Sequence, residues 1–276
     1  MNKIGIIGQG FVGNAVYQKF KKYYQILTYD LDETKATATE EEVLSCNVLF
    51  LCLPTPMHMG TGECDISIVA SILGKIINLN QRKVVVIKST VPPLTVASFN
   101  KITPKHIQVV FNPEFLTERN AVEDYNNQKR IILGGPRPAT TTLKRIFSKV
   151  FPKADIIKTD STHAEMVKYL TNTFLSTKVS FANEIYQLCE KVNIDYDKVV
   201  EYATYDERLG KSHWMVPGHD GDFGYGGHCF PKDLSALIHL ANRFKTTTNV
   251  LEAVKQTNDK VRNNRDWEQM KGRAVS

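Results

Sequence analysis

The chain has 276 residues, of which 42% are hydrophobic and 23% charged, and its formal net charge is +6 at pH 7. Such a composition is typical of a globular protein with one large or two medium domains. It contains no run of about 18 apolar residues, and the N-terminus leads directly into a folded pattern, so we expect neither a membrane span nor a signal peptide. The Lys and Arg residues are spread along the chain, which argues against nucleic-acid binding.

The cysteine content of the chain also restricts the class of protein. The five cysteines are odd in number and scattered, and no pair has the CxxC spacing of a zinc site. We therefore expect free thiols, a cytoplasmic location and no metal site.

The first part of the chain alternates short apolar runs with helical patterns such as 11–23 and 138–151. Most of the apolar runs are continuous, as in strands that are buried on both faces of a parallel sheet. This alternation predicts an α/β fold with a Rossmann-type doubly wound parallel sheet. The expected strands are 3–8, 25–30, 47–53, 83–89, 107–113, 130–135 and 154–159.

Strand signals disappear after residue 160, where a helical part begins. Residues 161–193 contain neither Gly nor Pro and carry apolar residues at three- and four-residue steps, which predicts one long helix with Ser161 as its N-cap. A helix of this length usually has a neighbour, so we expect a homodimer that packs through it. We place a NAD-binding domain at 1–159 and a helical domain at 160–276. Further helices are expected at 195–205, 231–245 and 249–262, and a fraying tail at 267–276.

A glycine turn near the N-terminus indicates a dinucleotide site. Gly8, Gly10 and Gly13 form a GxGxxG pattern between an expected strand and an expected helix, and Asp30 ends the next strand 22 residues after Gly8. The turn would hold a pyrophosphate against the helix N-terminus, and the carboxylate would accept hydrogen bonds from a ribose and repel a 2′-phosphate. This context favours NAD over a simple connecting turn. The cofactor contacts would also include the intervening residues Gln9, Phe11 and Val12.

Several polar residues follow the expected strands. Ligands of open α/β sheets bind beyond the carboxyl ends of the strands, so these residues together describe a polar rim on the cofactor side. Each one alone could equally be a loop residue or a helix cap, and Glu114 could begin a helix. The residues are Thr55, Ser89, Thr90, Glu114 and Glu118.

Lys168 and Asn172 are four residues apart and therefore share a face of the long helix. Their spacing alone fits a solvent-exposed stripe. Their closeness to the apolar side of the helix also fits partial burial.

The segment GDFGYGGHCFPKD, residues 221–233, sets a cysteine directly before an expected helix. Pro231 fits the first turn of that helix, and a thiol at a helix N-terminus is activated because the helix end stabilises the thiolate. The glycines would keep the approach to the sulfur open in a flexible cradle. We therefore favour Cys229 as a nucleophile over a buried structural cysteine, with Asp233 in the first helical turn. A thiol beside a nicotinamide cofactor indicates oxidation of an alcohol through a thiohemiacetal and a thioester to an acid.

The sequence resembles the UDP-glucose/GDP-mannose dehydrogenase family. The matching segments occur in family order: GIIGQGFVG, CLPTP, KSTVPP, NPEFLTERNAVEDYNNQKRIILGG, EMVKYLTNTFLSTKVSFANEI and GYGGHCFPKD. The resemblance implies an NAD-dependent four-electron oxidation of a nucleotide sugar to the uronic acid, with UDP-glucose as the first expectation. Members of the family normally continue into a third, α/β domain that helps to bind the nucleotide diphosphate, so the chain resembles a shortened form that lacks this UDP-binding domain.

The resemblance also implies roles for catalytic residues. Cys229 is similar to the family's nucleophile, Lys168 to the lysine that stabilises the developing oxyanion, and Asn172 to an asparagine near the reacting carbon. Asp233 resembles an acid that positions water and the lysine. Glu118 resembles a residue that handles the hydrolytic water, with Thr90 nearby.

The resemblance also implies residues that bind the substrate or the cofactor. Arg208 resembles an arginine that reaches the substrate of the partner subunit, and Lys35 and Lys232 resemble lysines that reach the cofactor. The substrate side is implied for Glu114, Phe115, Leu116, Tyr225 and Gly226.

Other functions remain open at this point. The nucleotide sugar could be GDP-mannose or a UDP-N-acetyl-hexosamine. The chain could also be a non-catalytic or partner-dependent binding relative. The 3-hydroxyacid and phosphogluconate dehydrogenases share a Rossmann domain followed by helices, but they need no cysteine, and they would form one NADH per substrate rather than two.

Overall fold

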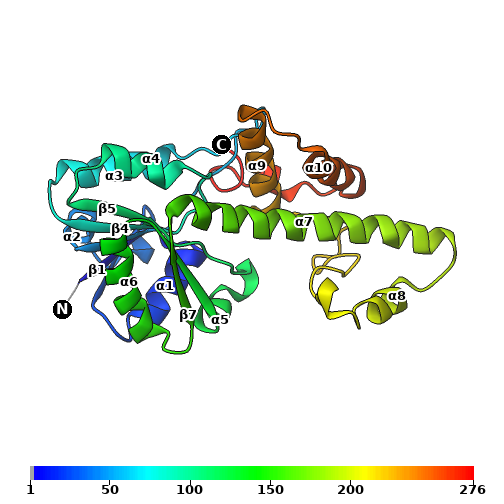
Figure 1. Cartoon of the computed structure of the whole chain (residues 1–276), viewed down its shortest axis with the longest axis horizontal. Coiled ribbons are helices and arrows are strands. Elements are labelled where there is room, and N and C mark those ends of the chain that lie inside the picture. The colour runs from blue at the N-terminus through cyan, green and yellow to red at the C-terminus, as the bar shows by residue number, and fades with distance from the viewer. Residues whose placement is uncertain (1–2) are drawn as a thin grey trace. The chain divides into compact units, whose positions relative to one another are not determined.

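The computed structural model describes residues 3–276. The chain forms two compact units. Unit 1 consists of the chain up to Thr55 together with Ile66–Lys168, and unit 2 of Pro56–Asp65 together with Tyr169–Ser276. The long helix α7 (Ser161–Lys191) begins in unit 1 and continues into unit 2 (Figure 1).

Unit 1 contains a seven-stranded sheet in the order β2-β1-β3-β4-β5-β6-β7, which confirms the Rossmann-type fold class. The first five strands are parallel, but β6 pairs antiparallel with β5, and β7 is parallel to β6. The expectation of a wholly parallel sheet is therefore wrong for the last two strands. A parallel pair needs a crossover, whereas the connection from β5 enters β6 from the same edge of the sheet. The strands are β1 (Ile4–Ile7), β2 (Ile26–Tyr29), β3 (Val48–Leu51), β4 (Lys83–Ile87), β5 (Ile107–Phe111), β6 (Arg130–Gly134) and β7 (Asp155–Thr159).

Helices cover both faces of this sheet, because its strands are apolar on both sides. One face packs against α2 (Glu40–Leu44), α3 (Ser67–Asn78), α4 (Thr95–Ile102) and the start of α7. The opposite face packs against α1, α5 and α6. Successive strand residues alternate between the two cores: Ile6 and Phe50 lie in the second, Ile7 and Leu51 in the first. The helices of the second face are α1 (Phe11–Phe20), α5 (Ala121–Asn126) and α6 (Arg137–Val150).

Unit 2 is built from the greater part of α7 and three further helices. These are α8 (Tyr196–Ala203), α9 (Phe230–Arg243) and α10 (Asn249–Val261), each within two residues of its expected bounds. The expected N-cap of α7 is wrong. Ser161 is already helical, and Asp160 caps the helix by accepting the His163 N–H at 3.0 Å.

The C-terminal residues are ordered by packing and do not fray. Trp267 and Val275 are buried in a small apolar cluster with Met57. The backbone N–H of Met57 donates to the carbonyl of Ala274 at 2.8 Å, and that of Ser276 donates to the carbonyl of Met57 at 3.0 Å. The tail and the Pro56–Asp65 loop therefore stabilise each other within unit 2.

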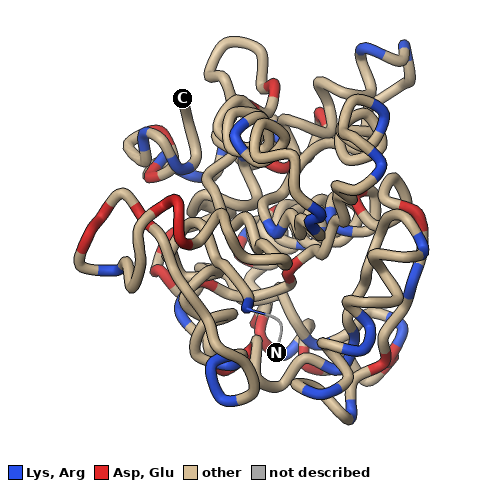
Figure 2. Tube along the Cα trace, turned by 90° about the vertical axis from the view of Figure 1, so that its left-hand side faces the viewer, with Lys and Arg blue, Asp and Glu red and all other residues tan. Residues whose placement is uncertain are grey.

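Lys and Arg are distributed along the whole described trace and interspersed with Asp and Glu (Figure 2). This distribution agrees with the absence of a dense basic run in the sequence. Among residues 3–276, no helix combines the length and the apolar character needed to span a membrane.

Candidate active site

The glycine turn after β1 has the geometry that a dinucleotide requires. Gly8 has a φ of +92°, and a Cβ there would lie 2.3 Å from the Cys52 carbonyl oxygen. A Cβ on Gly13 would lie 1.9 Å from the Gly8 carbonyl oxygen, so this glycine allows α1 to pack directly on the turn. Gly10 caps α1, and a Cβ there would meet nothing within 4 Å. Open space therefore faces the N-terminus of α1, where a pyrophosphate would bind.

Asp30 lies directly after β2, beside this turn. One carboxylate oxygen accepts the Gln9 N–H at 2.6 Å and the other accepts the Asp32 N–H at 2.9 Å. Two backbone donors thus fix the carboxylate and leave lone pairs for the hydroxyls of a ribose. The residues of unit 1 fit an NAD molecule with its pyrophosphate at Gly10 and a ribose at Asp30.

The polar residues after β3 and β4 bond to one another in unit 1. The Thr55 hydroxyl is buried and donates to the Thr90 carbonyl at 2.8 Å. The Ser89 hydroxyl accepts the Leu53 N–H at 2.9 Å. These bonds join the ends of β3 and β4 and hold the backbone of Thr90 in place.

Lys168 and Glu114 form a buried ion pair in unit 1. The Lys168 ammonium donates to a Glu114 carboxylate oxygen at 3.0 Å and to the Glu114 carbonyl at 2.7 Å. Burial works against ionisation of Glu114, but Lys168 and the Leu116 N–H outweigh it and lower the pKa of this carboxyl. Glu114 begins no helix. The Lys168 side chain is 3% exposed, so the alternative of a solvent-exposed stripe does not hold.

The residues around Glu114 differ in exposure. The Phe115 ring lies under two cations, with its centroid 4.6 Å from the Arg130 guanidinium and 5.6 Å from the Lys168 ammonium. Leu116 is half-buried, and its N–H donates to Glu114 at 2.8 Å. Glu118 is exposed at the start of a short 3-10 turn.

Two basic residues that the family resemblance assigns to binding, Lys35 and Arg208, lie on the surface of their units. Lys35 forms an exposed ion pair with Asp32 at 2.8 Å in unit 1. Arg208 is 88% exposed and pairs with Asp206 in unit 2. In the described part of the chain, both side chains pair with an acidic residue two or three positions away, and their assigned roles remain predictions.

In unit 2, Cys229 is the N-cap residue of α9, and Pro231 occupies the first turn. The sulfur is partly exposed. The first N–H groups of α9 point toward this end of the helix and carry its partial positive charge, which favours a thiolate.

Asp233 is the centre of a buried polar network in unit 2. Its carboxylate accepts the Asn172 amide N–H at 2.6 Å and the Lys232 ammonium at 2.5 Å, and the side chain is 1% exposed. Burial opposes the charge on Lys232, but Asp233 outweighs it and raises the pKa of this lysine. Asp233 was expected as an acid in the first turn of α9, and the structure shows that its carboxylate also orients the Asn172 amide.

Asn258, Arg262 and Asp266 hold the glycine loop before Cys229 in place, so it is not the flexible cradle that its composition suggests. Asn258 accepts the Tyr225 N–H at 2.7 Å, and Asp266 accepts the Gly227 N–H at 3.0 Å. A Cβ on Gly226 would lie 2.2 Å from the Arg262 guanidinium. The loop needs glycine there because Arg262 packs against its backbone.

The sequence patterns did not single out His228. Its Nε2 atom lies 3.4 Å from the Cys229 sulfur in unit 2. The signal was present as an imidazole next to the candidate thiol. However, adjacent residues in a chain usually direct their side chains apart, so the contact could not be inferred from position alone.

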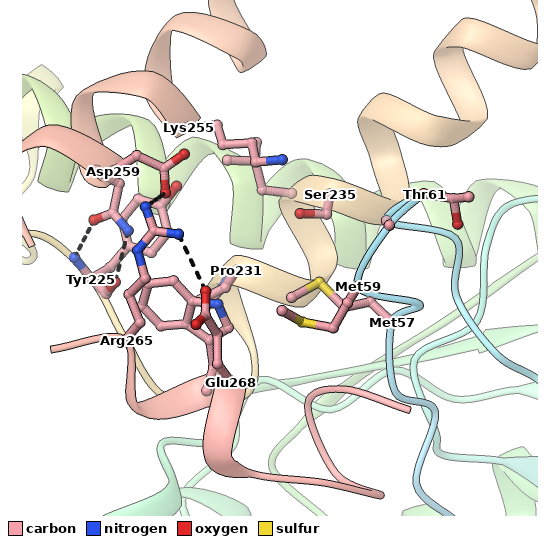
Figure 3. A pocket seen from close by; sticks show the side chains of 15 residues that line it. Met57, Met59, Thr61, Tyr225, Pro231, Ser235, Lys255, Asp259, Arg265 and Glu268 are labelled. Carbon is pink, nitrogen blue, oxygen red and sulfur yellow. Dashed lines mark hydrogen bonds and ion pairs between the residues drawn. The ribbon is translucent and has the colours of Figure 1, made fainter.

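A cavity of about 250 Å³ lies within unit 2, beside the start of α9. Figure 3 shows Met57 and Met59 on one side of the cavity, with their sulfur atoms directed toward the side on which Arg265 bridges Asp259 and Glu268. The Arg265 bonds are 3.0 Å to Asp259 and 3.2 Å to Glu268. Tyr225 and Pro231 also line this space, so it adjoins the segment that carries Cys229.

Among the described residues 3–276, no group of three or more His, Cys, Asp or Glu side chains could hold a metal ion. The candidate groups are a glycine turn and a buried lysine–carboxylate pair in unit 1, and a thiol with an adjacent imidazole in unit 2. The fold and these groups define a dinucleotide-binding protein with a helical second unit.

The comparisons with known proteins identify the family. Residues 32–153 match the NAD binding domain of the UDP-glucose/GDP-mannose dehydrogenase family, and residues 162–260 match its central domain. The UDP-glucose 6-dehydrogenase TuaD of Bacillus subtilis is 33% identical over 95% of this chain. AglM of Haloferax volcanii, also a UDP-glucose 6-dehydrogenase, is 30% identical over 93% of the chain. The chain belongs to the UDP-glucose/GDP-mannose dehydrogenase family.

Solved structures agree with this assignment. A UDP-glucose dehydrogenase from Pyrobaculum islandicum has a TM-score of 0.83 at 27% identity, over 94% of this chain and 68% of its own. The chain spans 64% of the length of the Bacillus relative and 69% of the Haloferax relative. Family membership brings with it the NAD-binding domain, as the glycine turn and Asp30 predicted.

Proposed function

We propose that the chain is an NAD-dependent nucleotide-sugar 6-dehydrogenase that oxidises UDP-glucose to UDP-glucuronate. The observation that carries the proposal is Cys229 at the N-cap of α9, with Asp233 holding Asn172 and Lys232 in the same unit. A four-electron oxidation of a primary alcohol needs such a thiol to retain the aldehyde between its two steps. The UDP-glucose 6-dehydrogenases among the relatives support this substrate.

The first unit would bind the cofactor. Gly8, Gly10 and Gly13 leave room for the pyrophosphate, and Asp30 would accept the hydroxyls of a ribose. When bound, NAD supplies a hydride acceptor for each of the two oxidations, so one substrate and one water yield the acid, two NADH and two protons. Further cofactor contacts are proposed for Gln9, Phe11, Val12, Lys35, Thr55, Ser89, Thr90 and Lys232.

Cys229 would act after the alcohol has become an aldehyde. Its thiolate adds to the carbonyl carbon and forms a thiohemiacetal, which loses the second hydride to become a thioester. Water then cleaves the carbon–sulfur bond and releases the acid and the thiol. We propose that Lys168 stabilises the oxyanions of these steps. Glu114 already fixes the Lys168 ammonium, so little reorganisation is needed.

Asn172 and Asp233 would orient the reacting groups. The Asn172 amide is held by the Asp233 carboxylate at 2.6 Å, which leaves its oxygen as an acceptor for a substrate hydroxyl or a water. Glu118 and Thr90 are proposed to handle the hydrolytic water. Substrate contacts are proposed for Glu114, Phe115, Leu116, Arg208, Tyr225 and Gly226.

We also propose a homodimer through α7. Its residues Leu170, Phe174, Phe181 and Leu188 are each more than half exposed, at 64%, 60%, 52% and 58%. At 3.6 residues per turn these four positions fall within about 40° of one another around the helix. A continuous apolar stripe of this length is typical of a helix that packs against a second copy. We further propose a domain boundary at residues 159–160 and a cytoplasmic location.

The function is tested by NADH absorbance with a panel of nucleotide sugars. We expect turnover with UDP-glucose and two NADH per sugar consumed. Turnover with GDP-mannose or a UDP-N-acetyl-hexosamine instead would change the substrate but keep the chemistry. One NADH per substrate would favour the 3-hydroxyacid class. Binding of NAD without turnover of any sugar would favour a non-catalytic relative.

A further inference from the structure

The residue just before the candidate nucleophile contacts it within unit 2. The His228 Nε2 atom is 3.4 Å from the Cys229 sulfur, within hydrogen-bonding range for sulfur. Both side chains are partly exposed. Imidazole exchanges its proton near neutral pH and can accept a proton at this nitrogen.

The backbone around His228 is held so that this contact can persist. Gly227 has a φ of +68°, a left-handed conformation that favours glycine, and its N–H donates to Asp266. On the other side, Cys229 begins α9, whose residues Pro231 and Asp233 are buried. Both neighbours of the His–Cys pair are therefore fixed, and the imidazole is directed to the sulfur by a turn that few other sequences would adopt.

Charged and titratable groups of unit 2 that lie near the His228–Cys229 pair include Lys232 with its partner Asp233, and also Asp266 and His213. Lys232 is buried next to Asp233, and its charge acts on both Cys229 and Cys64. Asp266 lies at the Gly227 N–H, and His213 packs against the Phe230 ring at 5.8 Å. The lysine stabilises a thiolate at position 229, but its own proton is bound tightly by Asp233. The His228 Nε2 atom contacts the sulfur directly and can accept its proton.

We propose that His228 is the base that takes the thiol proton of Cys229, so that the nucleophile rests as a thiolate beside an imidazolium. In this step the S–H bond breaks, a bond forms between that proton and Nε2, and no electrons leave the pair. When the thiol departs from the acid product, the same proton returns to the sulfur. The inference deepens the proposed function, since it assigns a base to the nucleophile on which that function rests.

The test measures thiol reactivity without substrate or cofactor. The rate at which iodoacetamide alkylates Cys229 is followed by peptide mass spectrometry from pH 5 to pH 10, in the wild type and in His228→Gln. The Cys229→Ser variant gives the background of the other four thiols. His239→Gln is the matched control, because His239 lies on α9, the helix that Cys229 caps, and its Nδ1 atom is 3.2 Å from the Thr61 carbonyl instead of a thiol.

We expect His228→Gln to move the midpoint of the alkylation profile upward by about one pH unit, which lowers the rate about tenfold at pH values below the wild-type midpoint. Addition of imidazole to a His228→Gly variant should restore part of the lost rate. His239→Gln should leave the profile unchanged. A matching profile in wild type and His228→Gln, with both proteins melting at the same temperature, would overturn the proposal.

The outcome is separable from that of the proposed function. If the profile shifts but no nucleotide sugar is oxidised, the His–Cys pair stands and the assigned reaction is wrong. If UDP-glucose is oxidised but the profile does not shift, the reaction stands and His228 is not the base. With both correct, His228→Gln should lower the rate of acid formation roughly 100-fold, the lower end for loss of a general base.

Discussion

Glu165 illustrates how one buried residue connects two parts of unit 1. It is fully buried on α7, and its carboxylate accepts the N–H groups of Leu94 and Val96, each at 2.8 Å. It thereby caps α4 from a neighbouring helix, one turn before Lys168. Burial raises the pKa of Glu165 to about 8, although the two N–H groups act in the opposite direction.

This shift predicts how stability changes with pH. The pKa of Glu165 is higher in the folded chain than the value of 4.5 for a free carboxyl group. Its contribution to stability is therefore complete below about pH 4.5 and is lost as the pH rises through 8. Relative to the wild type, Glu165→Gln should gain roughly 3–5 kcal/mol of unfolding free energy between pH 5 and pH 9, because the amide does not titrate.

Urea unfolding at several pH values measures this difference. The exposed Glu123→Gln on α5 serves as the control and should show the same pH dependence as the wild type. A constant difference between Glu165→Gln and the wild type across this range would contradict the account.

At the scale of single elements, two substitutions in the glycine turn before α1 should have different effects, one on stability and the other on cofactor binding. Gly13→Ala would place its Cβ 1.9 Å from the Gly8 carbonyl oxygen, so α1 must move away from the turn. We expect a loss of at least about 2 kcal/mol of stability. Gly10→Ala meets no protein atom within 4 Å and has a φ of −64°, so the fold should be retained. NAD binding should weaken at least tenfold, since the methyl group enters the pyrophosphate space.

Thermal melting and NADH fluorescence titration distinguish these effects. The account fails if Gly10→Ala binds NAD as tightly as the wild type, or if Gly13→Ala melts at the wild-type temperature.

Elements with a clear hydrophobic pattern could be predicted from the sequence. Features that depend on contacts between residues far apart in the sequence could not. The apolar strands and the helix at 161–191 follow from local pattern. The five-residue helix α2 (Glu40–Leu44) is too short to show a period. The direction of β6 depends on where its connection runs, and the order of the tail depends on Met57, more than 200 residues earlier.

The candidate site residues also differ in whether a local pattern or a long-range contact determines them. Gly8 and Asp30 could be proposed from their spacing, and Cys229 from its position directly before a predicted helix. Burial of Lys168 could not, because its partner Glu114 lies 54 residues away in the sequence. The contact between His228 and Cys229 depends on the backbone turn at Gly227, which no residue pattern specifies.

At the scale of the whole molecule, the apolar stripe on α7 predicts the oligomeric state. The double variant Phe174→Glu, Phe181→Glu introduces two charges into the stripe, whose burial against a second copy would be costly. We expect the wild type to sediment as a dimer and the variant as a folded monomer. Glu190→Lys, which changes charge on the opposite side of the same helix, is the matched control. A monomeric wild type at micromolar concentration would contradict the proposed dimer.

The most direct test of the central claim compares acid formation by the wild type and by Cys229→Ser, with NADH counted against the sugar consumed. The account predicts two NADH per UDP-glucose for the wild type. For Cys229→Ser it predicts loss of UDP-glucuronate formation while NAD binding is retained, because the hydroxyl cannot replace the thiolate. Formation of the acid by Cys229→Ser at the wild-type rate would contradict the assignment of Cys229 as the nucleophile.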